Sequence, residues 1–257
     1  MLTRNYVRLF IVFVSMLIVS TTGCSNTESS NVTTEGLKAE ITATATGNGS
    51  TGINVDLSVG SGGIFRTGVE LTSGDTLTAT DGSSTKTLVK DNNLLGDIEY
   101  ETSFSTDAEN TQFTVSMLRS NNDNAENSVV TMPAPYTLTT VPAAVSGSGS
   151  ATTALTWTNY DQNDTMTLDV ICDCSKTVNG QTSDYYYTHT LNVIDDGTES
   201  FSMRTLTHED DPSVFDRGCD IDITMKRTRT GTLDPAYGEG GYIRGVQARA
   251  KSISYTP

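Results

Sequence analysis

The chain has 257 residues, of which 35% are hydrophobic and 18% are charged, and its formal net charge is −15. Its length allows one large or two ordinary domains. The abundance of Thr, Ser, Asn and Gly is typical of β-sheet surfaces and turns. An acidic surface repels nucleic-acid phosphates and anionic lipids, so we expect no nucleic-acid partner and no electrostatic docking to membranes.

Residues 1–23 have the features of a secretory signal peptide. Arg4 and Arg8 precede an apolar run over residues 9–19, and small residues follow it. The run is too short to cross a bilayer comfortably. Two other interpretations of this segment stay open: an ordinary signal peptide that is cleaved, and a membrane anchor that is not cleaved.

The end of this segment, Thr21-Thr22-Gly23-Cys24, resembles the lipobox of bacterial lipoproteins. In that family the cysteine is acylated and becomes the first residue of the mature protein, although a leucine is usual where Thr21 stands. The resemblance implies lipidation at Cys24. It also implies a lipid-anchored protein of the bacterial outer membrane, because Ser25 replaces the aspartate that retains such proteins at the inner membrane.

Residues 24–36 are polar after the cysteine, which predicts a flexible tether. From Leu37 the apolar residues alternate with polar ones. The candidate strands are residues 37–45, 53–59, 68–71, 76–80, 85–90, 98–104, 112–118 and 128–132. Short strands at this spacing predict a first antiparallel β-sandwich over residues 37–140. The proline-rich segment 133–142 is predicted to be an extended connection to the second domain, with the boundary near Thr140.

The second domain, residues 141–257, is predicted from two alternating strands and three cysteines. In the strand after Asp164 the even-numbered residues, which include Cys172 and Cys174, share the apolar face, and Cys219 opens a later strand on its apolar face. In an exported domain these residues predict one disulfide. Cys174–Cys219 is preferred and Cys172–Cys219 is the close alternative, because neighbours two apart on a strand pair poorly. A zinc site is a third possibility.

The strand Leu155-Thr156-Trp157-Thr158, entered from a proline-rich segment and followed by an alternating strand, resembles fibronectin type III and related immunoglobulin-like modules. The resemblance implies an all-β chain with two tandem antiparallel, Ig/FnIII-like β-sandwich domains. Segments 133–142 and 227–256 are similar to those of bacterial lipoproteins whose activity is unknown, so they imply architecture and location alone.

The two histidines are not expected to meet. Residues 185–194 and 199–207 are predicted to form a hairpin around Asp195-Asp196-Gly197, which pairs Leu191 with Phe201. His208 would then lie about 16 Å from His189 along an extended strand.

Acidic residues concentrate between His208 and Asp222. Asp210, Asp211, Asp216 and Asp220 are calcium candidates, because calcium takes oxygen ligands in flexible geometry. The spacing matches no EF-hand, and a solvated acidic loop is the simpler interpretation. We expect no other cofactor.

Nothing in the sequence resembles a nucleophile elbow or a phosphate-binding loop. The sequence therefore predicts a non-catalytic envelope protein with a binding or structural role, whose partner is an envelope protein or a glycan. Two alternatives stay open. One is a calcium-stabilised adhesion module, and the other is a carbohydrate-active or accessory enzyme domain, because paired carboxylates converge only in three dimensions.

Overall fold

The computed structural model describes residues 26–60, 67–72, 74–92, 98–158, 164–238 and 240–257. The first half of this chain contains the strands β1 (Thr27–Glu28), β2 (Lys38–Ala45), β3 (Thr51–Val59), β4 (Thr67–Glu70), β5 (Thr76–Thr80), β6 (Thr85–Thr87), β7 (Val89–Asn92), β8 (Ile98–Phe104), β9 (Gln112–Leu118) and β10 (Ala125–Thr131). The second half contains β11 (Leu138–Thr140), β12 (Ala144–Ser146), β13 (Thr152–Trp157), β14 (Thr165–Val178), β15 (Gln181–Val193), β16 (Thr198–Ser202), β17 (Cys219–Thr230) and β18 (Tyr242–Thr256). The one α-helix among the described residues is α1 (Met203–Thr207). Turns of 3-10 helix lie at Ser29–Asn31, Thr34–Gly36 and Pro212–Val214.

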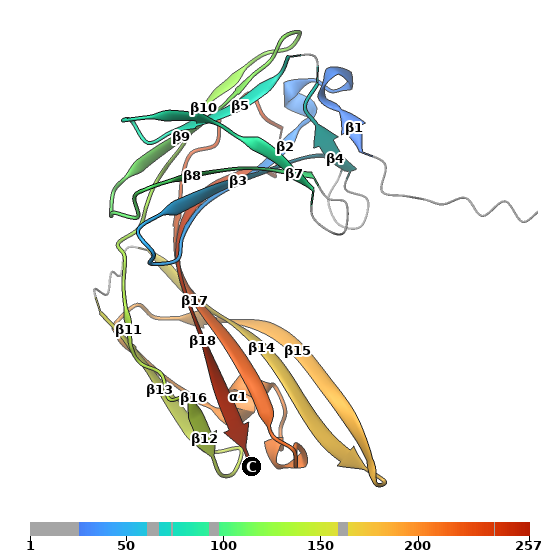
Figure 1. The fold of residues 1–257 in the computed structure, drawn as a ribbon, viewed down its shortest axis with the longest axis vertical. Coiled ribbons are helices and arrows are strands. Elements are labelled where there is room, and N and C mark those ends of the chain that lie inside the picture. The colour runs from blue at the N-terminus through green and yellow to red at the C-terminus, as the bar shows by residue number, and fades with distance from the viewer. Residues whose placement is uncertain (1–25, 61–66, 73, 93–97, 159–163, 239) are drawn as a thin grey trace, which may run out of the picture.

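One bent sheet contains strands from both halves of the described chain. It contains 11 of the described strands, in the order β1-β4-β3-β2-β18-β17-β14-β15, with β8 and β7 beside β3 and with β12 beside β18. Most pairings are antiparallel, but β1 with β4, β2 with β18 and β12 with β18 are parallel. Figure 1 shows this sheet turning from β8 and β3 at the top into the long descending strands β17, β18, β14 and β15.

Two smaller sheets complete the sandwich layers. The sheet β10-β9-β5-β6 covers the upper part of the large sheet and forms the upper module with it (Figure 1). The sheet β11-β13-β16 covers the lower part of the large sheet and forms the lower module with it (Figure 1). Each interface encloses its own apolar cluster, one around Phe104 and Phe113 and the other around Trp157 and Phe215. The prediction of an all-β chain with sandwich layers is therefore confirmed.

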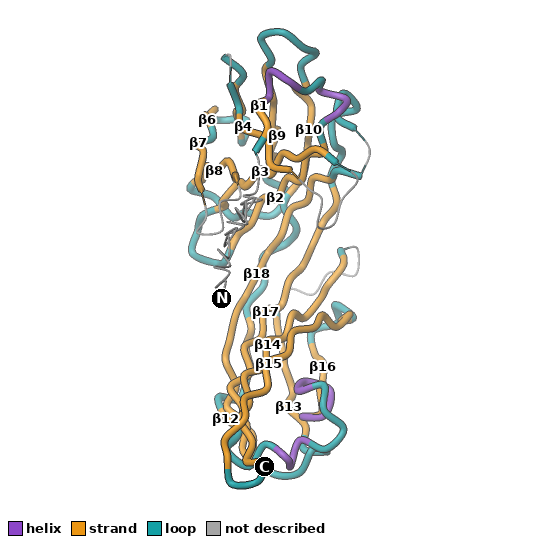
Figure 2. The backbone as a smooth tube through the Cα atoms, turned by 90° about the vertical axis from the view of Figure 1, so that its right-hand side faces the viewer, coloured by secondary structure: helices purple, strands orange, loops and turns teal. Residues whose placement is uncertain are grey.

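The β17–β18 hairpin belongs to both modules. Ile243 in β18 lies in the upper cluster, whereas Ile253 and Tyr255 of the same strand lie in the lower one. The two strands pair without interruption from Cys219↔Tyr255 to Thr230↔Arg244, and Figure 2 shows them running past the junction. Between the clusters the hairpin carries the buried polar residues Arg227 and Gln247.

The proline-rich segment crosses this hairpin at the junction of the modules. Its carbonyl groups accept hydrogen bonds from side chains of the hairpin: Arg227 Nη1 donates to Ala134 O (2.6 Å), Gln247 Nε2 to Pro133 O (3.3 Å) and Arg249 Nε to Tyr136 O (2.9 Å). Buried carbonyl groups need hydrogen-bond donors. In this segment the donors are long side chains of the hairpin and not the backbone N–H groups of a neighbouring strand.

The expectation of a flexible tether is wrong for residues 26–36. Thr27–Glu28 pairs with β4, and Ser29 and Thr34 are buried. Arg119, itself buried, donates to Ser29 O (2.6 Å), Val32 O (2.9 Å) and Thr34 Oγ1 (3.2 Å). The segment needs no large apolar residues because small polar groups are buried together with their hydrogen-bond partners.

The predicted strand over residues 85–90 is divided between two sheets. β6 pairs with β5 in the small upper sheet, and β7 pairs with β8 in the large one. Leu88 lies between them, is buried, and donates its backbone N–H to Leu77 O (2.9 Å). Strands that change sheets in this way form the corners of sandwiches.

The predicted hairpin of β15 with β16 is also wrong. β15 pairs with β14, β16 pairs with β13, and the residues between them cross from one sheet to the other. Asp195 within this connection is buried and bonds to Arg227. After Ser202 the chain turns into α1, so Leu206, which falls in the predicted strand 199–207, is buried on a helix instead.

Candidate binding surface

The exposed face of the large sheet is concave. In Figure 1 the upper part of the sheet and the descending strands meet at an angle, and Figure 2 looks toward this side. Period-two alternation sends Ile41 and Ala43 into the upper core and leaves Thr42 and Thr44 on the concave face. Threonine suits this position because β-branched side chains pack well on a pleated sheet.

Strand register gathers hydroxyl groups into rows at the bend of the sheet. One row runs Thr44↔Val246↔Thr228↔Thr165 across β2, β18, β17 and β14. A neighbouring row runs Thr42↔Arg244↔Thr230. Three separate parts of the sequence, β2, β14 and the β17–β18 hairpin, therefore present their side chains to one place.

These rows line a cavity of about 690 Å³, which we call the waist groove. Val246 and Ala248 form a buried apolar floor. The remaining lining is mostly threonine: Thr42, Thr44, Thr165, Thr167, Thr190, Thr228 and Thr230. The groove therefore combines a short apolar strip with many hydroxyl donors and acceptors.

The charged side chains of the waist groove are held by neighbours. Lys226 Nζ lies 2.5 Å from Asp169 Oδ2, and Thr190 Oγ1 donates to the other oxygen of that carboxylate (2.8 Å). The Arg244 guanidinium stands 3.6 Å from the ring centroid of Tyr242. These contacts place each charged group of the groove beside a partner.

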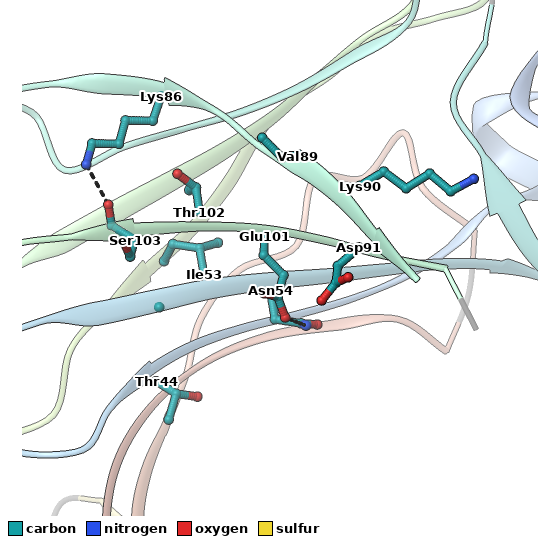
Figure 3. A pocket seen from close by; sticks show the side chains of 11 residues that line it. Thr44, Ile53, Asn54, Lys86, Val89, Lys90, Asp91, Glu101, Thr102 and Ser103 are labelled. Carbon is teal, nitrogen blue, oxygen red and sulfur yellow. Dashed lines mark hydrogen bonds between the residues drawn. The ribbon is translucent and has the colours of Figure 1, made fainter. Parts of the chain in front are cut away.

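A second cavity of about 700 Å³, which we call the upper groove, adjoins the first and shares Thr44 with it. Figure 3 shows Asn54, Asp91 and Glu101 close together on its wall. Asn54 Nδ2 donates to Glu101 Oε1 (3.1 Å) and to Glu99 Oε2 (2.9 Å), and Lys86 Nζ donates to Ser103 O (2.6 Å). Val89 lines this groove and is largely exposed.

The disulfide Cys174–Cys219 is present, as preferred from the sequence. The two residues face each other directly in the pairing of β14 with β17. The alternative pairing of Cys172 is wrong: Cys172 is a buried free thiol whose Sγ contacts Leu206 O at 2.9 Å. Its partner in β17 is Ile221, so no second cysteine faces it.

The structure does not bring the calcium candidates into one site. Asp211 caps the 3-10 turn at Ser213, Asp216 accepts from Thr177 N (2.8 Å), and Asp220 accepts from Ser254 Oγ (3.3 Å). The side chain of Asp210 is exposed. Within the described ranges, no group of three His, Cys, Asp or Glu side chains is placed to bind a metal together.

The histidines do meet, contrary to the expectation from the sequence. Their ring centroids lie 5.5 Å apart, and His208 stacks on Tyr187 at 4.4 Å. The extended path assumed between them does not exist, because α1 shortens it and His208 reverses the chain in a left-handed conformation. Burial lowers the pKa of His189, although its hydrogen bond with Thr205 O opposes the shift.

The predicted signal peptide, with Cys24, lies outside the described residues. In the described part of the chain, no helix is both long enough and apolar enough to cross a membrane.

No family model and no curated protein matches the sequence. Among solved structures, the FN1–FN3 domains of chicken CNTN1 match at 10% identity and a TM-score of 0.29, over 90% of this chain and 68% of that one. The Yersinia pseudotuberculosis adhesin InvE matches at 11% identity and a TM-score of 0.23, over 86% of this chain and 60% of that one. Both similarities are too distant to bear on the strand arrangement or on function.

Proposed function

We propose that this chain is a non-catalytic, lipid-anchored protein of the bacterial cell envelope that binds a hydroxyl-rich ligand, such as a glycan, along its concave face. The waist groove carries the proposal. Threonine side chains from four strands would exchange hydrogen bonds with ligand hydroxyls, while Val246 and Ala248 would contact the apolar face of a sugar ring. Its charged groups would help to orient the ligand.

The chemistry of this groove favours binding over catalysis. Asp169 is the one carboxylate among its described lining residues, and it is engaged by Lys226 and Thr190. Hydrolysis of glycosides normally needs two carboxyl groups on opposite sides of the scissile bond. Asp169 therefore lacks the partner that such chemistry requires in the groove.

A glycan array with the purified protein tests the proposal. Thr44→Val and Thr228→Val each remove one groove hydroxyl at nearly constant shape, and each should weaken binding about 2- to 10-fold. Thr85→Val changes an exposed threonine on β6, outside both grooves, and serves as the matched control. Binding that survives both groove substitutions unchanged would refute the assignment of the ligand to this groove.

A carbohydrate-active enzyme is the second candidate, and the upper groove favours it. Asp91 and Glu101 approach the same space there, as Figure 3 shows. Incubation of the protein with a panel of glycosides would detect hydrolysis. Loss of such activity in Glu101→Gln, with retained activity in Glu99→Gln, would replace the non-catalytic proposal with an enzymatic one.

The membrane attachment is tested separately at Cys24. We expect Cys24→Ala to leave the precursor uncleaved and without an acyl label in cells fed a tagged fatty acid. The wild-type chain should be labelled and should fractionate with the outer membrane. Continued labelling of the variant would contradict lipidation at this position.

A further inference from the structure

The long strand β15 has one free edge. Its 13 residues pair with β14 without a register shift, from Met166↔Val193 to Val178↔Gln181. No other described strand pairs with it, so β15 ends the large sheet on this side. In Figure 1 it forms the outer margin of the lower module.

The register shows which backbone groups of β15 face this edge. The Cα atoms of Cys174 and Cys219 lie 4.0 Å apart, the close spacing of a non-hydrogen-bonded pair, and Ser175 N donates toward Gly218 O instead. Cys174 therefore turns its N–H and C=O toward Tyr185 of β15. Because this direction alternates along a strand, Tyr186 and Thr188 turn their N–H and C=O groups toward the free edge.

This edge lacks the features that normally prevent strand addition. The sequence Gln-Thr-Ser-Asp-Tyr-Tyr-Tyr-Thr-His-Thr-Leu-Asn-Val of β15 contains no proline and no lysine, and its pairing shows no bulge. Asp184 is its one charged residue. An edge of this length without such protection is open to pairing with another extended segment.

The side chains of β15 present rings on both faces of the edge. Tyr185, Tyr187 and His189 form a row on one face, and His208 stacks on the central ring. On the other face Tyr186 is 68% exposed. An added strand would find ring contacts for alternate side chains on each side of its backbone.

The charges around the edge are mainly acidic. Asp173 lies opposite Tyr186 in β14, and Glu209 lies near Tyr185. Asp169, opposite Thr190, is already paired with Lys226. Two basic residues also lie near the edge: Lys176 stands opposite Ser183 in β14, and Arg204 acts on Asp211. A second copy of this chain, with its net charge of −15, would bring the same acidic groups to the contact.

We propose that the free edge of β15 takes up an extended basic polypeptide segment as an additional antiparallel or parallel strand. Backbone hydrogen bonds to Tyr186 and Thr188 would supply the pairing, and lysine or arginine side chains on the added strand would complement Asp184 and its acidic neighbours. This inference is independent of the grooves, which lie on other strands for most of their lining.

The test is a titration of the purified protein with a synthetic peptide of alternating lysine and valine. Thr188→Pro removes one N–H from the free edge and leaves the β14 ladder intact, so binding should weaken at least about tenfold. Thr188→Val keeps that N–H and should bind as the wild type does. Thr188→Lys, which imitates natural edge protection, should also weaken binding and provides a second variant if the proline disturbs folding.

Three outcomes would overturn the proposal. One is equal binding of the peptide to the wild type, Thr188→Pro and Thr188→Lys when all three melt alike. Another is equal binding of a control peptide in which glutamate replaces lysine. The third is a concentration-dependent dimer of the wild type that Thr188→Pro abolishes, since the edge would then pair with a second copy.

Discussion

Arg227 of β17 connects two segments that are distant in the sequence, the proline-rich segment at Ala134 and the connection between β15 and β16 at Asp195. Its side chain is fully buried, and it bonds to Asp195 through Nε (2.6 Å) and Nη2 (3.0 Å). Trp157 Nε1 donates to the same carboxylate (2.7 Å). A buried ion pair adds little over an apolar substitute, but removal of one partner leaves an uncompensated charge.

Asp195→Ala should therefore lower the free energy of unfolding by about 3–5 kcal/mol, because Arg227 would stay buried without its counter-ion. Urea unfolding followed by Trp157 fluorescence measures the change. The adjacent Asp196→Ala removes an exposed carboxylate that accepts from Thr198 N, so its cost should stay below about 1 kcal/mol. Equal costs for the two variants would contradict the role assigned to Asp195.

Cys172 is expected to be unreactive. Burial raises the pKa of its thiol to about 12, so almost no thiolate is present at pH 8. Iodoacetamide should leave Cys172 unmodified in the folded chain and label it in denaturant, as peptide mass spectrometry would show. Rapid labelling of the native protein would mean that the lower core opens at this position.

At the scale of elements, the N-terminal segment depends on the loop that carries Arg119. Asp75 bonds to Arg119 Nε (2.7 Å) and accepts from Ser120 N (2.8 Å), and both charged side chains are almost inaccessible. Burial by itself raises the pKa of Asp75, but the bonds from Ser120, Ser29 and Arg119 outweigh it, and the net pKa is lowered. The ionised form is therefore the one that folding stabilises.

This shift determines a pH dependence. The stabilisation from Asp75 should be complete above the ordinary carboxyl pKa of about 3.9 and should be lost as the pH falls through the lowered pKa of the folded state. The difference in unfolding free energy between the wild type and Asp75→Asn should be constant above about pH 4 and shrink below it. Urea titrations at a series of pH values measure it, and a difference that grows on acidification would contradict the assignment.

At the scale of the whole molecule, the β17–β18 hairpin makes the two cores dependent on each other. β18 contributes Ile243 to the upper core and Ile253 to the lower one, β17 pairs with it throughout, and the buried contacts of Arg227 and Gln247 fill the junction. Separate unfolding of either module would expose part of a strand that the other still uses. We therefore expect one cooperative transition.

Phe113→Ala tests this expectation, because Phe113 lies in the upper core and the single tryptophan, Trp157, lies in the lower one. The substitution should cost about 3–5 kcal/mol and should shift the Trp157 fluorescence transition by as much as the circular dichroism transition. A fluorescence midpoint that stays at its wild-type value would indicate two independently folding modules.

Local patterns predicted the strands well and their partners poorly. Residues 76–80, 98–104 and 112–118 are strands at the predicted bounds, because alternation marks a half-buried strand wherever it lies. The same alternation does not indicate which sheet a strand joins. This is why the predicted pairing of β15 with β16 is wrong and why one predicted strand is divided into β6 and β7.

For the candidate site, too, the sequence shows which residues alternate along a strand but not which strands lie side by side. Threonines at every second position, as at Thr42 and Thr44 or Thr228 and Thr230, are visible in the sequence, but only the parallel pairing of β2 with β18 brings these pairs together. The prediction of a flexible tether is wrong for residues 26–36 because the groups that this segment buries are small and polar. Their partner Arg119 is far away in the chain, so the sequence pattern does not reveal it. The meeting of His189 and His208 depends on the short helix α1 and on the left-handed backbone of His208.

By itself the sequence determined the all-β class, the alternating faces of the strands and the inward direction of the three cysteines in the second domain. These are properties of neighbouring residues, which set the local backbone and the side on which each side chain lies. The tertiary structure alone decided the shared hairpin, the grooves at the bend and the free edge of β15. Those features arise from pairings between distant segments, whose energy depends on the packing of the complete chain.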